Sequence, residues 1–154
     1  MTPTHRERFD RLLEDVIAGL PRKVAALLEE VAVHVLDRPS AEMVEQLRRD
    51  GTLGPDEDGA DLCGLHSGVA ITERSVEDPG GWGADLGVPE HVHLFREGIV
   101  ALAFENLGIE NPERGWDHPE SDEEIYEEIR VTLLHEIGHH FGLDEDDLDE
   151  LGFA

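Results

Sequence analysis

Cysteine is almost absent from this chain of 154 residues, because Cys63 is the only one. A single cysteine forms no internal disulfide, which suits a reducing compartment and leaves any metal site to be built from His, Asp and Glu. Long apolar runs are also missing, since nothing approaches the ~20 residues of a membrane-spanning helix. The first eight residues are polar and lack the apolar stretch of a signal peptide. We therefore expect an unexported, cytoplasmic protein that does not enter membranes.

Basic residues are scarce as well. The chain has 12 Lys and Arg against 37 Asp and Glu, which gives a formal charge of −25. Nucleic-acid binding depends largely on Lys and Arg contacts to phosphates, so nucleic acid is excluded as an expected partner. With 39% apolar and 32% charged residues, the composition is that of a folded globular chain. The length suits one domain, residues 1–154.

The apolar patterns predict an α+β fold, in which a small sheet packs on helices. Apolar residues at helical spacing indicate helices, and short β-branched runs between Gly, Pro and Asp residues indicate strands. The predicted helices cover 5–19, a stretch starting at Pro21, and 99–107, and the predicted strands cover 31–36, 69–72 and 92–95. Residues 50–61 are predicted to be a loop and 108–120 a polar connection.

A long helix is predicted from Ser121 onward. Ser121 and Glu124 have the spacing of a capping box, and the acidic first turn suits the positive end of the helix dipole. An apolar residue then recurs at every fourth position, which predicts one buried stripe: Ile125, Ile129, Leu133, Ile137 and Phe141. Gly142 is predicted to end the helix.

The last turns of this helix contain the sequence HEIGH, residues 135–139. His135 and His139 are four residues apart, so they share one face of the helix and two imidazoles can reach one metal ion. Glu136 projects beside that face, close enough to act as general base without binding the metal. The pattern predicts a metal centre held by His135 and His139, with Glu136 as the catalytic residue.

Two histidines do not complete a catalytic zinc site, which takes three protein ligands and a water. Acidic residues follow the motif directly, and several can supply the third ligand. The candidates are Asp144, Glu145 and Asp146 or, if the helix continues, Asp149 and Glu150.

The run TLLHEIGHHFGLDED, residues 132–146, resembles the small bacterial zincin-like metallopeptidase family. The segments 62–69, 72–74 and 92–96 also look like family segments, although His66 stands where the family has an aromatic residue and Gly98 where it has proline. The resemblance implies a compact zincin-like domain, a bound Zn²⁺ and peptidase activity. It also implies a sharp turn at Gly142, which favours Glu145 as the third metal ligand.

A second histidine pattern is His91-x-His93, on the strand predicted at 92–95. Alternate residues of a strand share a face, so the two imidazoles are expected side by side. We interpret this strand as an edge strand, on which the pair is either ordinary or lines the cleft or binds a second metal. His66 is a further candidate for the cleft.

The predicted function is zinc-dependent hydrolysis of peptides or unfolded proteins, with Glu136 taking the proton of the attacking water. One alternative is a catalytically silent metal-binding or interaction protein, since the chain has few residues to spare for substrate pockets. Another is a small acidic interaction module in which the HExxH pattern is accidental. A metal-dependent ribonuclease is disfavoured by the acidic composition.

Overall fold

The structure, a computed structural model, describes residues 1–67, 90–141 and 146. These residues form six helices and three strands. The elements are α1 (Pro3–Ala18), α2 (Arg22–Leu28), β1 (Val31–Leu36), α3 (Ala41–Arg49), β2 (Gly64–Ser67), β3 (Glu90–Phe95), α6 (Arg96–Asn106), α7 (Pro112–Gly115) and α8 (Ser121–Phe141). None of the helices in the described part combines the length and hydropathy needed to span a bilayer. The predicted α+β class is confirmed.

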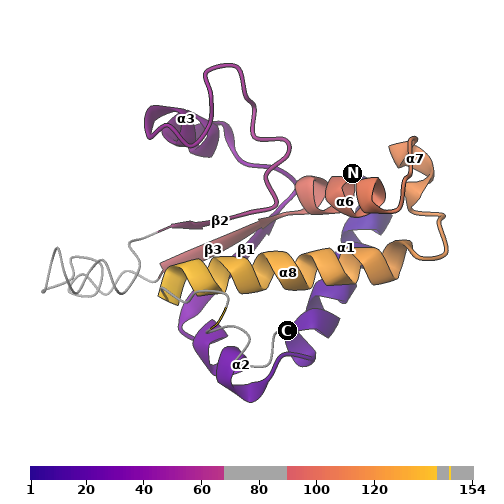
Figure 1. The fold of residues 1–154 in the computed structure, drawn as a ribbon, viewed down its shortest axis with the longest axis horizontal. Coiled ribbons are helices and arrows are strands. Elements are labelled where there is room, and N and C mark those ends of the chain that lie inside the picture. The colour runs from indigo at the N-terminus through magenta and orange to yellow at the C-terminus, as the bar shows by residue number, and fades with distance from the viewer. Residues whose placement is uncertain (68–89, 142–145, 147–154) are drawn as a thin grey trace, which may run out of the picture.

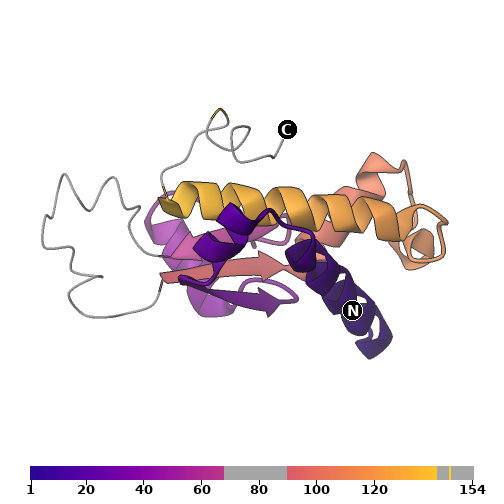
Figure 2. The same cartoon turned by 90° about the horizontal axis from the view of Figure 1, so that it is seen from below.

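The strands form one mixed sheet in the order β1-β3-β2. β1 pairs in parallel with β3, and β2 pairs antiparallel with β3. Figures 1 and 2 show α8 running along the strands on one face of the sheet, with α1 crossing it obliquely on the same side. β3 is therefore the central strand among the described ones, and β2 is an outer strand beside α8.

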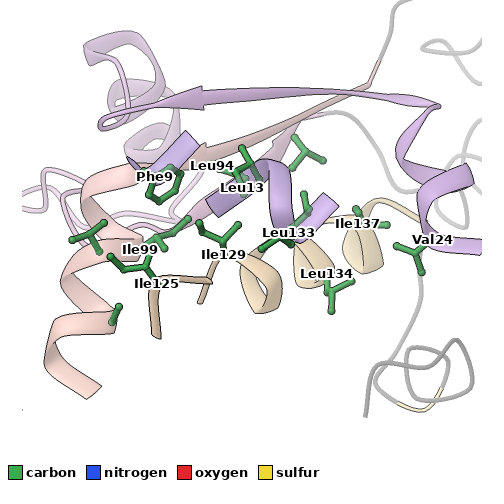
Figure 3. Packing of buried hydrophobic residues seen from close by; sticks show 14 of the residues in the cluster. Phe9, Leu13, Val24, Leu94, Ile99, Ile125, Ile129, Leu133, Leu134 and Ile137 are labelled. Atoms are coloured by element: carbon green, nitrogen blue, oxygen red, sulfur yellow. The ribbon is translucent and has the colours of Figure 1, made fainter. Parts of the chain in front are cut away.

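The core lies between that face of the sheet and the helices. β3 contributes Val92 and Leu94, both fully buried, because alternate residues of a strand point to the same side. The stripe predicted on α8 is confirmed at four positions, since Ile125, Ile129, Leu133 and Ile137 are at most 1% exposed. Figure 3 shows these side chains beside Phe9 and Leu13 of α1 and Leu94 of β3. Burial of this stripe therefore fixes how α8 is rotated against the sheet.

The start of α8 differs from the predicted capping box. The backbone N–H of Glu124 donates to the Glu120 carbonyl, not to the hydroxyl of Ser121. Ser121 is completely buried, and its Oγ lies 3.4 Å from the Trp116 carbonyl and accepts a hydrogen bond from Arg8. The capping-box prediction is wrong because the serine is used to attach α1 and the preceding turn to the helix.

Most of the other predicted elements are confirmed: helices 5–19 and 99–107 correspond to α1 and α6, and strands 31–36 and 92–95 to β1 and β3. Helix α3 was not predicted. Ser40 caps it by accepting a hydrogen bond from the Met43 N–H, and Leu47 is its one buried residue. The short helix α7 and the strand β2 were not predicted either. The strand predicted at 69–72 and the helix end at Gly142 lie outside the described residues.

Gly98, in the first turn of α6, packs directly on the loop that leads into β2. A Cβ atom at this position would overlap the carbonyl oxygen of Leu62 and would lie 2.6 Å from the Leu62 carbonyl carbon. The Phe95 N–H also donates to the Cys63 carbonyl, at 2.9 Å. The absence of a side chain at position 98 thus lets β2 begin at the right place beside β3 and α8.

Candidate active site

The HExxH residues lie in the last two turns of one continuous helix, because α8 runs from Ser121 to Phe141 without interruption. Positions 135 and 139 are consequently one turn apart on the same face. His135 is exposed, whereas Leu134 and Ile137 are buried. The imidazole of His135 thus points away from the apolar core, as a metal ligand at the surface of the helix must.

Glu136 lies between the exposed and the buried sides of α8, and its side chain is half-buried. It packs against the backbone of β2 at Gly64. A Cβ atom built on Gly64 would lie 2.9 Å from Thr132 Cγ2, 3.0 Å from Glu136 Cγ and 3.2 Å from the His93 carbonyl oxygen. β2 therefore approaches α8 closely at the residue predicted to be the general base, and this approach requires glycine.

Gly64→Ala is expected to destabilise the fold and to displace the Glu136 side chain. Overpacking of this kind costs about 1–3 kcal/mol, because either Thr132 or the strand must move. Chemical denaturation would measure the change in the free energy of unfolding. Gly54→Ala is the matched control, because its new Cβ would meet the end of the flexible Glu57 side chain at 3.3 Å. Equal stability of the two variants would contradict the close packing of β2 on α8.

Cys63, the residue before Gly64, shares this environment. Burial raises the pKa of its thiol to about 11, and the nearby carboxylates of Glu128, Asp61 and Glu136 act in the same direction. A thiol with so high a pKa is protonated at neutral pH and is a poor nucleophile and metal ligand. Cys63 is half-buried, so we interpret it as a packing residue.

Several predicted site residues lie partly or wholly outside the described part of the chain. The backbones of His139 and His66 are described, in α8 and β2, but their side chains are not. Asp146 is described and exposed. The candidate ligands Asp144, Glu145, Asp149 and Glu150 lie outside the described residues. Among the His, Cys, Asp and Glu side chains that are described, no group of three is already positioned to hold a metal ion.

His91 and His93 do not lie on an edge strand, so that interpretation was wrong. They belong to β3, which is paired on both sides. Strand alternation puts them on the face opposite to Val92 and Leu94, which belong to the core shared with α8. On that face they contact His34 of β1, a residue that the sequence did not single out. The sequence did place His34 between two valines of the predicted first strand. Its contact with His91 and His93 could not be predicted, because it depends on the register in which β1 and β3 pair.

A separate cavity of about 930 Å³ lies at the other end of α8. It is formed where the start of α1 meets α6 and α7, and its lining includes Trp116, Phe104, Glu105 and Glu113. Figure 1 shows α7 at the opposite end of α8 from the HExxH turns. The cavity is therefore not part of the candidate active site.

Residues 112–153 match the family described as zincin-like metallopeptidase. The matched segment contains α7, α8 and the acidic stretch that follows, and thus His135, Glu136, His139 and Glu145. No curated protein matches the chain. The resemblance stated from the sequence is confirmed for this segment, whereas the family-like segments 62–69, 72–74 and 92–96 lie outside the match and remain a prediction. The similarity to metallopeptidases thus covers the HExxH helix and less than half of the chain.

Proposed function

We propose that this protein is a zinc-dependent peptidase of a reducing, cytoplasmic compartment, with His135 and His139 as metal ligands and Glu136 as general base. The observation that supports it best is the position of the motif. His135 is exposed on α8, Glu136 is held against an outer strand of the sheet, and the family match covers the same helix. The donor set also fits, because imidazole and carboxylate are ordinary zinc ligands.

The division of labour follows from the residue types. When bound, Zn²⁺ would polarise the scissile carbonyl and acidify water. Glu136 accepts a proton from the attacking water on a carboxylate oxygen and returns it to the leaving amine nitrogen. Its packing against Gly64 restricts the side chain, so that the carboxylate is held in place before substrate arrives. Peptides and unfolded chains are the proposed substrates.

Glu145 is the proposed third ligand. The support is the family resemblance of the segment that includes Gly142, together with the family match over residues 112–153. The other candidates are tested beside it. Glu145→Ala should weaken zinc binding more than Asp144→Ala or Asp146→Ala, whereas a larger effect at Asp149 or Glu150 would transfer the role to that residue.

The metal centre is tested by zinc binding. His135→Ala/His139→Ala should lose the tightest zinc equivalent of the wild-type protein, because two of three protein ligands are removed. Isothermal titration calorimetry with Zn²⁺ would measure it, with His118→Ala as the control, since His118 lies outside the motif and accepts a hydrogen bond from the Glu120 N–H. A double variant that binds as many equivalents of zinc as the wild type, and as tightly, would refute the assignment of the ligands.

A further inference from the structure

Three imidazoles lie together on the face of the sheet that is turned away from α8. His34 of β1 is directly opposite His93 of β3 in the parallel register, and His91 is two residues before His93 on the same face. The ring centre of His34 lies 4.8 Å from that of His91 and 5.0 Å from that of His93. The rings of His91 and His93 are 6.2 Å apart. We call these residues the histidine triad.

The spacing of the triad is that of imidazoles around one metal ion. Ring nitrogens bind zinc at 2.0–2.1 Å, so tetrahedral angles put the centres of three ligand rings about 5 Å from one another. The observed separations of 4.8, 5.0 and 6.2 Å bracket this value. A paired sheet is also a rigid support for such ligands, because hydrogen bonding between the strands fixes all three backbones.

One nitrogen of the triad is buried without a hydrogen-bond partner among the described residues. His34 Nε2 and His91 Nδ1 are 2.7 Å apart, a distance that one shared proton accounts for. The buried nitrogen is His93 Nδ1, which has no hydrogen-bond partner in the part of the chain that the structure describes. An unsatisfied buried nitrogen costs free energy, and a cation bound by its lone pair would remove that cost.

We propose that His34, His91 and His93 form a binding site for a Zn²⁺ or Cu²⁺ ion, separate from the HExxH centre. Three imidazoles make a complete set of protein ligands for a site whose fourth position holds water. Imidazole suits both metals, and copper is the tighter of the two. The proposal does not depend on peptidase activity.

Closure of the site requires a movement of side chains only. The triad nitrogens do not converge on one point as they lie, in line with the absence of a ready three-ligand group among the described residues. Rotation about the terminal torsion of histidine is broad, and it moves a ring nitrogen by about 2 Å. His34 is exposed, so its ring has room to turn once a metal ion replaces its hydrogen bond to His91.

The surroundings favour a bound cation. The formal charge of −25 creates a field that attracts metal ions.

The experiment uses the His135→Ala/His139→Ala protein, so that the HExxH centre is absent. Titration calorimetry with Zn²⁺, and electron paramagnetic resonance with Cu²⁺, should detect one equivalent bound by nitrogen ligands. Adding His34→Ala or His91→Ala should weaken binding at least tenfold and abolish the rise in melting temperature caused by the metal. Adding His118→Ala should change neither value.

Two results would overturn the proposal. One is a His135→Ala/His139→Ala protein that binds neither metal, and the other is binding that is unchanged by both His34→Ala and His91→Ala. Melting curves of the metal-free proteins verify that each variant is folded, and His34→Gln replaces His34→Ala if the latter is not. Because the HExxH histidines are absent throughout, failure here leaves the proposed peptidase untouched, and loss of zinc from the HExxH centre leaves this site untouched.

Discussion

Glu136→Gln should lower the rate of peptide hydrolysis by a factor of about 10²–10⁴, the contribution that general base catalysis typically makes. Glutamine has nearly the shape of glutamate and packs in the same way against Gly64, but it cannot accept the proton of the attacking water. Zinc binding should be unchanged, because Glu136 is not a proposed ligand. The measurements are hydrolysis of a library of extended, unstructured peptides and zinc titration of both proteins.

The outcome also separates the proposed peptidase from its alternatives. A wild-type protein that binds zinc and cleaves no peptide across a broad library would favour the silent metal-binding protein. A wild-type protein that binds no zinc would favour the acidic interaction module. Equal cleavage by wild type and Glu136→Gln would mean that the activity belongs to another group. Hydrolysis of RNA by the wild type alone would favour the ribonuclease.

Gly98→Ala should destabilise the protein by about 3 kcal/mol or more, as expected when overpacking strikes a fixed backbone. The new Cβ would overlap the Leu62 carbonyl, which belongs to the loop leading into β2. Because this carbonyl is part of the backbone, it cannot make room by a change of side-chain rotamer. Helix propensity alone predicts the opposite sign, because alanine is favoured over glycine within a helix by about 1 kcal/mol. Urea denaturation therefore tests the contact, because the sign of the change in the free energy of unfolding differs between the two expectations.

Leu102→Ala is a suitable control for that experiment. Leu102 lies on the same helix but is exposed, so its truncation should change stability by less than about 0.5 kcal/mol. Increased stability of Gly98→Ala would contradict the contact between α6 and the loop. It would also remove the reason for glycine at a position where the family pattern has proline.

Local sequence patterns predicted much of the fold, including the helix that contains the HExxH motif. The apolar residue at every fourth position of α8 was sufficient to place the stripe from Ile125 to Ile137 in the core. His135 does not belong to that stripe and lies outside the core. β1 was predicted to the residue, because a valine-rich run between a turn and Asp37 has few other structures open to it. These successes share a cause, since each depends on residues close together in sequence.

The misses depend on residues that are far apart. The Ser121 hydroxyl bonds to Arg8 of α1, and a local capping rule contains no information about that helix. The contact between His34 and His91 depends on the parallel register of β1 and β3. The close approach of Gly64 to Glu136 likewise depends on how the sheet and α8 pack. No pattern within ten residues of any of these positions specifies its partner.

The packing of α8 has a consequence for how the chain acquires its structure. The buried stripe of this helix is covered by α1, α6 and strands β2 and β3, all of which lie outside the segment 112–153 that matches the family. That segment alone leaves Ile125, Ile129, Leu133 and Ile137 facing water, and an isolated helix is marginal when its stability derives from tertiary contacts. The HExxH turn is therefore held in place only when residues far away in the sequence have packed on α8, so a fragment that contains the whole recognisable motif should not by itself reproduce the site.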